Sequence, residues 1–202
     1  MTEPITIPTA RGDVLALWDA PAGPPRAAAV LVGGGDGGFD GPAEALYPTL
    51  AEDLVPLGLG VLRLDFRIHR FPNDVDEGVH DVLAGLDWLQ GQGVEAAGLV
   101  GHSFGGAVVI EAAAQAPSVG AVVTLATQTA GAQRVALVAP RPLLLIHGLE
   151  DVRLSPRCSE LLYGMAGEPK SLVLIPGATH SLRQAREDVR TRVLDFLAAS
   201  LR

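Results

Sequence analysis

The sequence predicts an α/β protein with a mostly parallel central sheet, helices on both faces and an N-terminal hairpin. Short apolar runs alternate with longer amphipathic or apolar segments along the chain. The short runs, such as AAAVLV at 27–32, are continuous rather than alternating, as in strands buried on both faces. With 202 residues, 48% of them hydrophobic, the chain can bury one core, so we expect a single domain over 1–202.

Local patterns place the expected elements. Ile5–Ile7 and Val14–Trp18 flank Arg11-Gly12-Asp13, which is typical of a hairpin. Further strands are expected at 27–32, 59–64, 97–100, 121–126, 143–146 and 172–175, and helices at 42–57, 74–89, 107–116, 155–165 and 184–197. Pro48 and Pro56 predict that the first helix is short or kinked. Only about fourteen residues, 128–141, separate two of the strands, so no cap domain fits there.

Charge and composition exclude several classes of function. The formal net charge of −8 disfavours nucleic acid or an anionic membrane as partner. The longest uncharged run, 112–133, contains Pro117 and Gly120 and is not typical of a membrane span, and the N-terminus lacks a secretory pattern. We therefore expect a cytoplasmic location. Cys158 is the single cysteine and the histidines lack ligand spacing, so neither a metal nor a cofactor is expected.

One motif predicts a nucleophile. The residues Gly101-His102-Ser103-Phe104-Gly105 match G-x-S-x-G and lie between an expected strand and an expected helix. Glycines at 101 and 105 remove side chains that would collide with neighbouring backbone in so sharp a turn. The turn also places the serine at a helix N-terminus, where free N–H groups favour negative charge. The pattern therefore predicts that Ser103 is a catalytic nucleophile.

Four segments together resemble a known family. They are VLVGGGDGG (30–38), GHSFGG (101–106), LLLIHGLED (143–151) and LIPGATHSL (174–182). In this order and spacing the chain resembles the α/β-hydrolase superfamily, and most of all the small, lidless serine hydrolases of the dienelactone-hydrolase-like group. The resemblance runs from about Ala27 to the C-terminus. It implies the α/β-hydrolase fold and a triad in the chain order serine, acid, histidine.

The resemblance also implies the other two members of the triad. Asp151 matches the acid of the family pattern H-G-x-x-D, with Glu150 as its neighbour, and the segment after the preceding strand, TLATQTAG, carries no carboxylate. His180 matches the family histidine after the last strand. The imidazole would take the serine proton, and the carboxylate would hold the imidazole in the correct tautomer.

The oxyanion hole is expected from two backbone N–H groups, one of them on Phe104. The other lies in the loop 33–38, where this chain has Gly33-Gly34 in place of the family's His-Gly. Gly35 is the closest match for that donor and Asp36 the second.

The remaining histidines have other expected roles. His102 is expected to point away from the chemistry, and His147 to support the acid loop. His69 and His80 are expected to be structural or exposed.

These residues predict a serine hydrolase that cleaves a carboxylic ester or thioester of a small molecule through an acyl-enzyme. Amide hydrolysis or acyl transfer on the same triad is one alternative, and a non-catalytic binding protein of the same fold is another. The short 128–141 connection predicts an open site that prefers short acyl groups.

Overall fold

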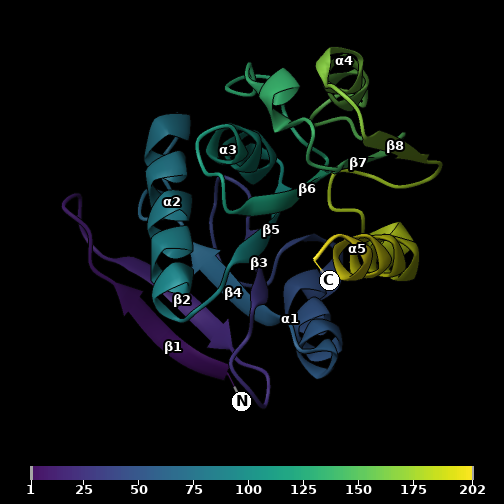
Figure 1. Ribbon diagram of the computed structural model, residues 1–202. Coiled ribbons are helices and arrows are strands. Elements are labelled where there is room, and N and C mark those ends of the chain that lie inside the picture. Colours follow the sequence, from purple (N-terminus) through teal and green to yellow (C-terminus); the bar gives the residue numbers. More distant parts are fainter. Residues whose placement is uncertain (1, 202) are drawn as a thin grey trace.

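An eight-stranded sheet forms the centre of the molecule in the computed structural model, which describes residues 2–201 (Figure 1). The strands lie in the order β1-β2-β4-β3-β5-β6-β7-β8. Their bounds are β1 Thr2–Ile7, β2 Val14–Asp19, β3 Ala27–Val32, β4 Gly60–Asp65, β5 Ala96–His102, β6 Val119–Leu125, β7 Leu143–Gly148 and β8 Lys170–Ile175. The β1–β2 hairpin is antiparallel and β2 runs antiparallel to β4, whereas every pairing from β4 to β8 is parallel. The predicted fold class is confirmed.

Helices cover both faces of this sheet (Figure 1). One face packs against α2 (Val75–Gly91), α3 (Phe104–Ala113) and α4 (Arg157–Met165), and the other against α1 (Pro42–Leu54) and α5 (Arg186–Ser200). All six residues of β3 are buried, because apolar side chains from both layers meet at this strand. Continuous apolar strands follow directly from a sheet covered in this way.

The helix that follows β3 is kinked, as its prolines predict. Ala43, Glu44 and Ala45 have left-handed backbone angles, and Pro48 lies inside the helix. The regular part ends at Leu54, where a 3₁₀ turn (Val55–Leu57) takes over at Pro56. A proline removes one helical N–H and clashes with the preceding turn, which explains why the regular helix ends before Pro56.

No cap covers the sheet edge within residues 2–201. The connection between β6 and β7 holds only a 3₁₀ turn, Val135–Val138. The loops after β3, β4, β5, β7 and β8 all leave the carboxyl ends of parallel strands, so they meet at one edge of the sheet. In the described part of the chain, no helix has the length and apolar content needed to cross a membrane.

Candidate active site

Ser103 occupies a strained turn between β5 and α3. Its backbone angles are φ 56° and ψ −115°, a conformation that residues with a side chain rarely adopt. A Cβ on Gly101 would overlap the carbonyl oxygen of Gly105, and a Cβ on Gly105 would overlap that of Gly33. The turn therefore packs backbone against backbone, at a distance that only glycine allows, and raises the Ser103 hydroxyl above the sheet edge.

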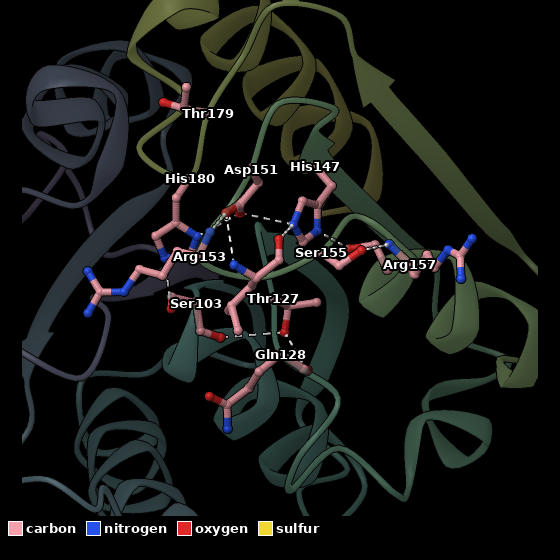
Figure 2. A network of polar contacts seen from close by, with 12 residues as sticks. Ser103, Thr127, Gln128, His147, Asp151, Arg153, Ser155, Arg157, Thr179 and His180 are labelled. Atoms are coloured by element: carbon pink, nitrogen blue, oxygen red, sulfur yellow. Dashed lines mark hydrogen bonds and ion pairs between the residues drawn. The ribbon is translucent and has the colours of Figure 1, made fainter.

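His180 and Asp151 extend from Ser103 as a continuous chain of hydrogen bonds (Figure 2). The His180 Nε2 atom lies 3.1 Å from Ser103 Oγ, and its Nδ1 atom lies 2.7 Å from Asp151 Oδ2. The three residues come from the loops after β8, β5 and β7, so the parallel sheet brings together side chains that are far apart in the sequence. Glu150, in contrast, is exposed to solvent.

The Asp151 carboxylate accepts four hydrogen bonds in a buried position. Its Oδ1 atom accepts the backbone N–H groups of Arg153 (2.8 Å) and Leu154 (2.9 Å). Its Oδ2 atom accepts from His180 and from His147, at 3.1 Å from the latter. Burial opposes ionisation, but the Leu154 N–H and the His180 ring outweigh it, so the pKa of Asp151 lies below its ordinary value. The carboxylate is therefore charged at neutral pH.

His147 holds this carboxylate from the side opposite His180 (Figure 2). It is fully buried on β7, and its Nε2 atom also lies 3.0 Å from the Leu154 carbonyl oxygen. Both neighbours of Nε2 are acceptors, so this nitrogen carries the proton and Nδ1 accepts from the Ser159 hydroxyl at 2.7 Å. Burial lowers the pKa of His147, which keeps the ring neutral. The residue supports the acid loop, as expected from the sequence.

His102 contradicts the sequence expectation, because it lies within the site. Its Nε2 atom is 3.1 Å from the His180 carbonyl oxygen, and the two rings lie with their centroids 4.9 Å apart. Strand β5 ends at this residue and the sharp turn begins, so the side chain contacts the His180 loop instead of packing into the core. Burial lowers the pKa of His102 to about 4, and the neutral ring donates its Nε2 proton to that carbonyl.

A cleft of about 280 Å³ opens above Ser103 and is lined by the loop 33–41, His102, Ser103, Arg153 and His180. Arg153 is exposed and was not anticipated from the sequence. The feature of the sequence that could have identified Arg153 is its position two residues after Asp151.

The predicted oxyanion donors lie in the loop 33–38, which lines this cleft, and at Phe104, the residue after Ser103. Phe104 is the first residue of α3, where helix N–H groups lack partners within the helix. Within residues 2–201, the N–H groups of Gly35 and Asp36 donate to no protein acceptor. Over the same residues, no cluster of three or more His, Cys, Asp or Glu side chains could hold a metal ion.

The neutral state of His102 predicts a pH-dependent stability. Its folded pKa of about 4 lies below the ordinary 6.5, so between these two pH values the unfolded chain binds a proton at His102 that the folded chain does not bind. This stability is present above pH 6.5 and is lost as the pH falls toward 4. We expect His102→Gln to reduce the loss across this window by up to about 3 kcal/mol.

Urea unfolding at a series of pH values measures this effect. His69→Gln is the matched control, because the His69 side chain is 45% exposed. An unchanged slope in His102→Gln would show that the ring has the same pKa in the folded and unfolded chain.

Sequence comparisons match only short stretches of the chain. No protein-family model matches it. A stretch of 74 residues is 42% identical to uncharacterized protein YfhR of Escherichia coli K12, over 35% of this chain and 26% of that protein. A stretch of 43 residues is 49% identical to uncharacterized protein PA2218 of Pseudomonas aeruginosa, over 21% of this chain and 11% of that protein. The first match thus spans about a quarter of the length of YfhR.

Solved structures match the whole fold. Dienelactone hydrolase from Anabaena variabilis superposes with a TM-score of 0.86 at 22% identity, over 100% of this chain and 99% of that one. Est1E from Butyrivibrio proteoclasticus gives 0.81 at 20%, over 98% of both chains. XC6422 from Xanthomonas campestris, a serine hydrolase without a lid, gives 0.76 at 20%, over 99% and 95%. The chain therefore has the α/β-hydrolase fold in the compact form of dienelactone hydrolase and the lidless serine hydrolases.

Proposed function

We propose that this protein is a serine hydrolase that cleaves a carboxylic ester or thioester of a small molecule through an acyl-enzyme. The observation that carries the proposal is the hydrogen-bonded chain from Ser103 Oγ through His180 to the charged Asp151 carboxylate. A serine hydroxyl is a poor nucleophile at neutral pH, so it needs an adjacent base. The arrangement supplies the base and the group that orients it.

The proposed reaction begins at the Ser103–His180 contact. His180 Nε2 removes the hydroxyl proton while Ser103 Oγ forms a bond to the ester carbonyl carbon. The tetrahedral intermediate then loses its alcohol or thiol, which takes the proton from His180 Nε2 as it leaves. A water molecule repeats the two steps on the acyl-enzyme, which releases the acid and restores Ser103. Asp151 stays ionised throughout and stabilises the protonated imidazole.

Backbone N–H groups beside Ser103 would stabilise the negative charge of the intermediate. Phe104 supplies one from the start of α3, and the loop 33–38 supplies the other from Gly35 or Asp36. One such donor is worth roughly 3–4 kcal/mol of the activation barrier.

Two structures of the same fold support ester chemistry. One is the esterase domain of a Rhodothermus marinus protein, with a TM-score of 0.80 at 22% identity, and the other is Est1E with ferulic acid bound. The fold alone does not establish activity, so the proposal rests on the residues of the cleft.

If Ser103 is the nucleophile, ester hydrolysis depends completely on its Oγ atom. Ser103→Ala should lower kcat/KM for p-nitrophenyl acetate by at least about 10⁴-fold, because no nucleophile remains. A fluorophosphonate probe should label the parent protein and leave the variant unlabelled. An unlabelled parent protein would favour a non-catalytic binding role, and a variant with retained turnover would exclude Ser103 as the nucleophile.

The acid assignment predicts different effects from two neighbouring carboxylates. Asp151→Asn should lower kcat by about 10⁴-fold, because an amide favours the wrong tautomer of His180. Glu150→Gln is the matched control and should stay within about twofold of the parent, since its side chain is exposed. Steady-state kinetics on both purified variants decide the matter; a larger loss in Glu150→Gln would require a different acid.

The open cleft predicts a preference for short acyl groups. Within residues 2–201 only a 3₁₀ turn separates β6 from β7, and the cleft holds about 280 Å³. Methylene groups gain about 0.8 kcal/mol each only while they are buried. For p-nitrophenyl esters of increasing chain length, kcat/KM should level off or fall beyond short chains. A steady rise out to long-chain esters would contradict the open-site interpretation.

A further inference from the structure

Two side chains, one at the end of β4 and one in the loop after it, hold the glycine-rich loop 33–38 in place. The Asn73 side-chain amide donates to the carbonyl oxygen of Gly35 at 2.9 Å. The Asp65 carboxylate accepts the N–H of Gly38 at 2.7 Å. Strand β4 lies beside β3 in the sheet, so its loop reaches the loop after β3 directly. The candidate oxyanion loop is therefore anchored from outside the cleft.

The loop contains a tight turn that fixes a second carbonyl. The N–H of Gly37 donates to the carbonyl oxygen of Gly34 at 3.0 Å. In a planar trans peptide the C=O and the N–H point in opposite directions. Holding the Gly34 and Gly35 carbonyls thus fixes the directions of the Gly35 and Asp36 N–H groups, which are the two candidate donors.

Close packing shows why this loop is rich in glycine. A Cβ on Gly35 would overlap Asn73 Oδ1, and a Cβ on Gly37 would overlap both Asp65 Oδ1 and His69 Nε2. The anchoring side chains fit only against bare backbone. The glycines of GGGDGG therefore allow close packing against the loop after β4 as well as against the serine turn.

We propose that Asn73 is a positioning residue for the oxyanion hole. Through the Gly35 carbonyl it orients the peptide group that carries the Asp36 N–H, and it keeps the turn pressed toward Ser103. Because it acts on donors of the acyl-transfer step, the inference rests on the proposed function. Asp65 contacts Gly38 at the far end of the loop, so its hydrogen bond does not orient either candidate donor.

The test uses full-length variants and three readouts. Asn73→Leu removes the donor at similar size, and Asn73→Ala does so without added bulk. Arg70→Ala is the matched control, since it changes an exposed residue of the same loop. For each protein we would measure kcat and KM for p-nitrophenyl acetate, the thermal midpoint, and inhibition by a trifluoromethyl ketone, whose tetrahedral adduct carries an oxyanion.

We expect both Asn73 variants to lose at least about tenfold in kcat, below the 100- to 1,000-fold that removal of a donor itself costs. KM and the thermal midpoint should stay near the parent values, while the ketone should bind more weakly by a factor similar to the loss in kcat. Arg70→Ala should match the parent in all three readouts.

Two results would overturn the inference while leaving the proposed function intact. One is unchanged kcat and ketone affinity in both Asn73 variants. The other is a loss of kcat accompanied by a raised KM and a lowered thermal midpoint, which indicates a merely structural role. A parent protein that neither hydrolyses esters nor reacts with the fluorophosphonate probe would instead refute the proposed function, and the oxyanion role with it.

Discussion

The geometry of the site depends on one buried carboxylate. The Asp151 carboxylate accepts four hydrogen bonds on its two oxygen atoms, and the donors come from three parts of the site wall. The backbone N–H groups close the acid loop on itself, His147 ties the loop to β7, and His180 ties it to the loop after β8. Burying a charged carboxylate costs free energy unless hydrogen bonds compensate for it, so the buried Asp151 carboxylate needs all of these contacts. Fixing the carboxylate therefore fixes the ring that faces Ser103.

Two neutral histidines, His147 and His102, contact the triad and leave the exchange of protons with Ser103 to the ring of His180. His147 and His102 both have lowered pKa values because they are buried, and each directs its Nε2 proton to an acceptor in the site wall. Their protons are committed to hydrogen bonds with Asp151 and with the His180 carbonyl. Among the histidines in contact with the triad, His180 is the one whose Nε2 atom faces the serine hydroxyl.

Much of this arrangement follows from the sequence, because parallel strands bring their carboxyl ends to one edge. Apolar runs marked the strands, and the strand–turn–helix context marked Ser103. The family pattern H-G-x-x-D favoured Asp151 over Glu150, and the structure puts Asp151 beside His180. The strands and the serine turn could be predicted from the order of elements and from local patterns, whereas the acid and the histidine also needed the resemblance to a known family.

The remaining features depend on orientation or on distant contacts. The sequence led us to expect His102 to point away, but the turn at Ser103 redirects the chain where β5 ends. The loop 33–38 has five glycines among six residues, so no side-chain pattern reveals which N–H groups stay free. Asn73 is 38 residues from Gly35, and only the β3–β4 pairing brings the two together.

The strand order places two kinds of stabilising group on opposite sides of Ser103. Loops after β3 and β4 lie on one side of the serine turn, and they carry or position the N–H groups that would stabilise the negative charge of the intermediate. Loops after β7 and β8 lie on the other side and hold the groups that would move the proton. Negative charge develops on the carbonyl oxygen as positive charge develops on His180, so opposite stabilising groups must face each other across Ser103. A parallel sheet with Ser103 after a central strand meets that requirement without a cap, since each set of loops is anchored by its own neighbours.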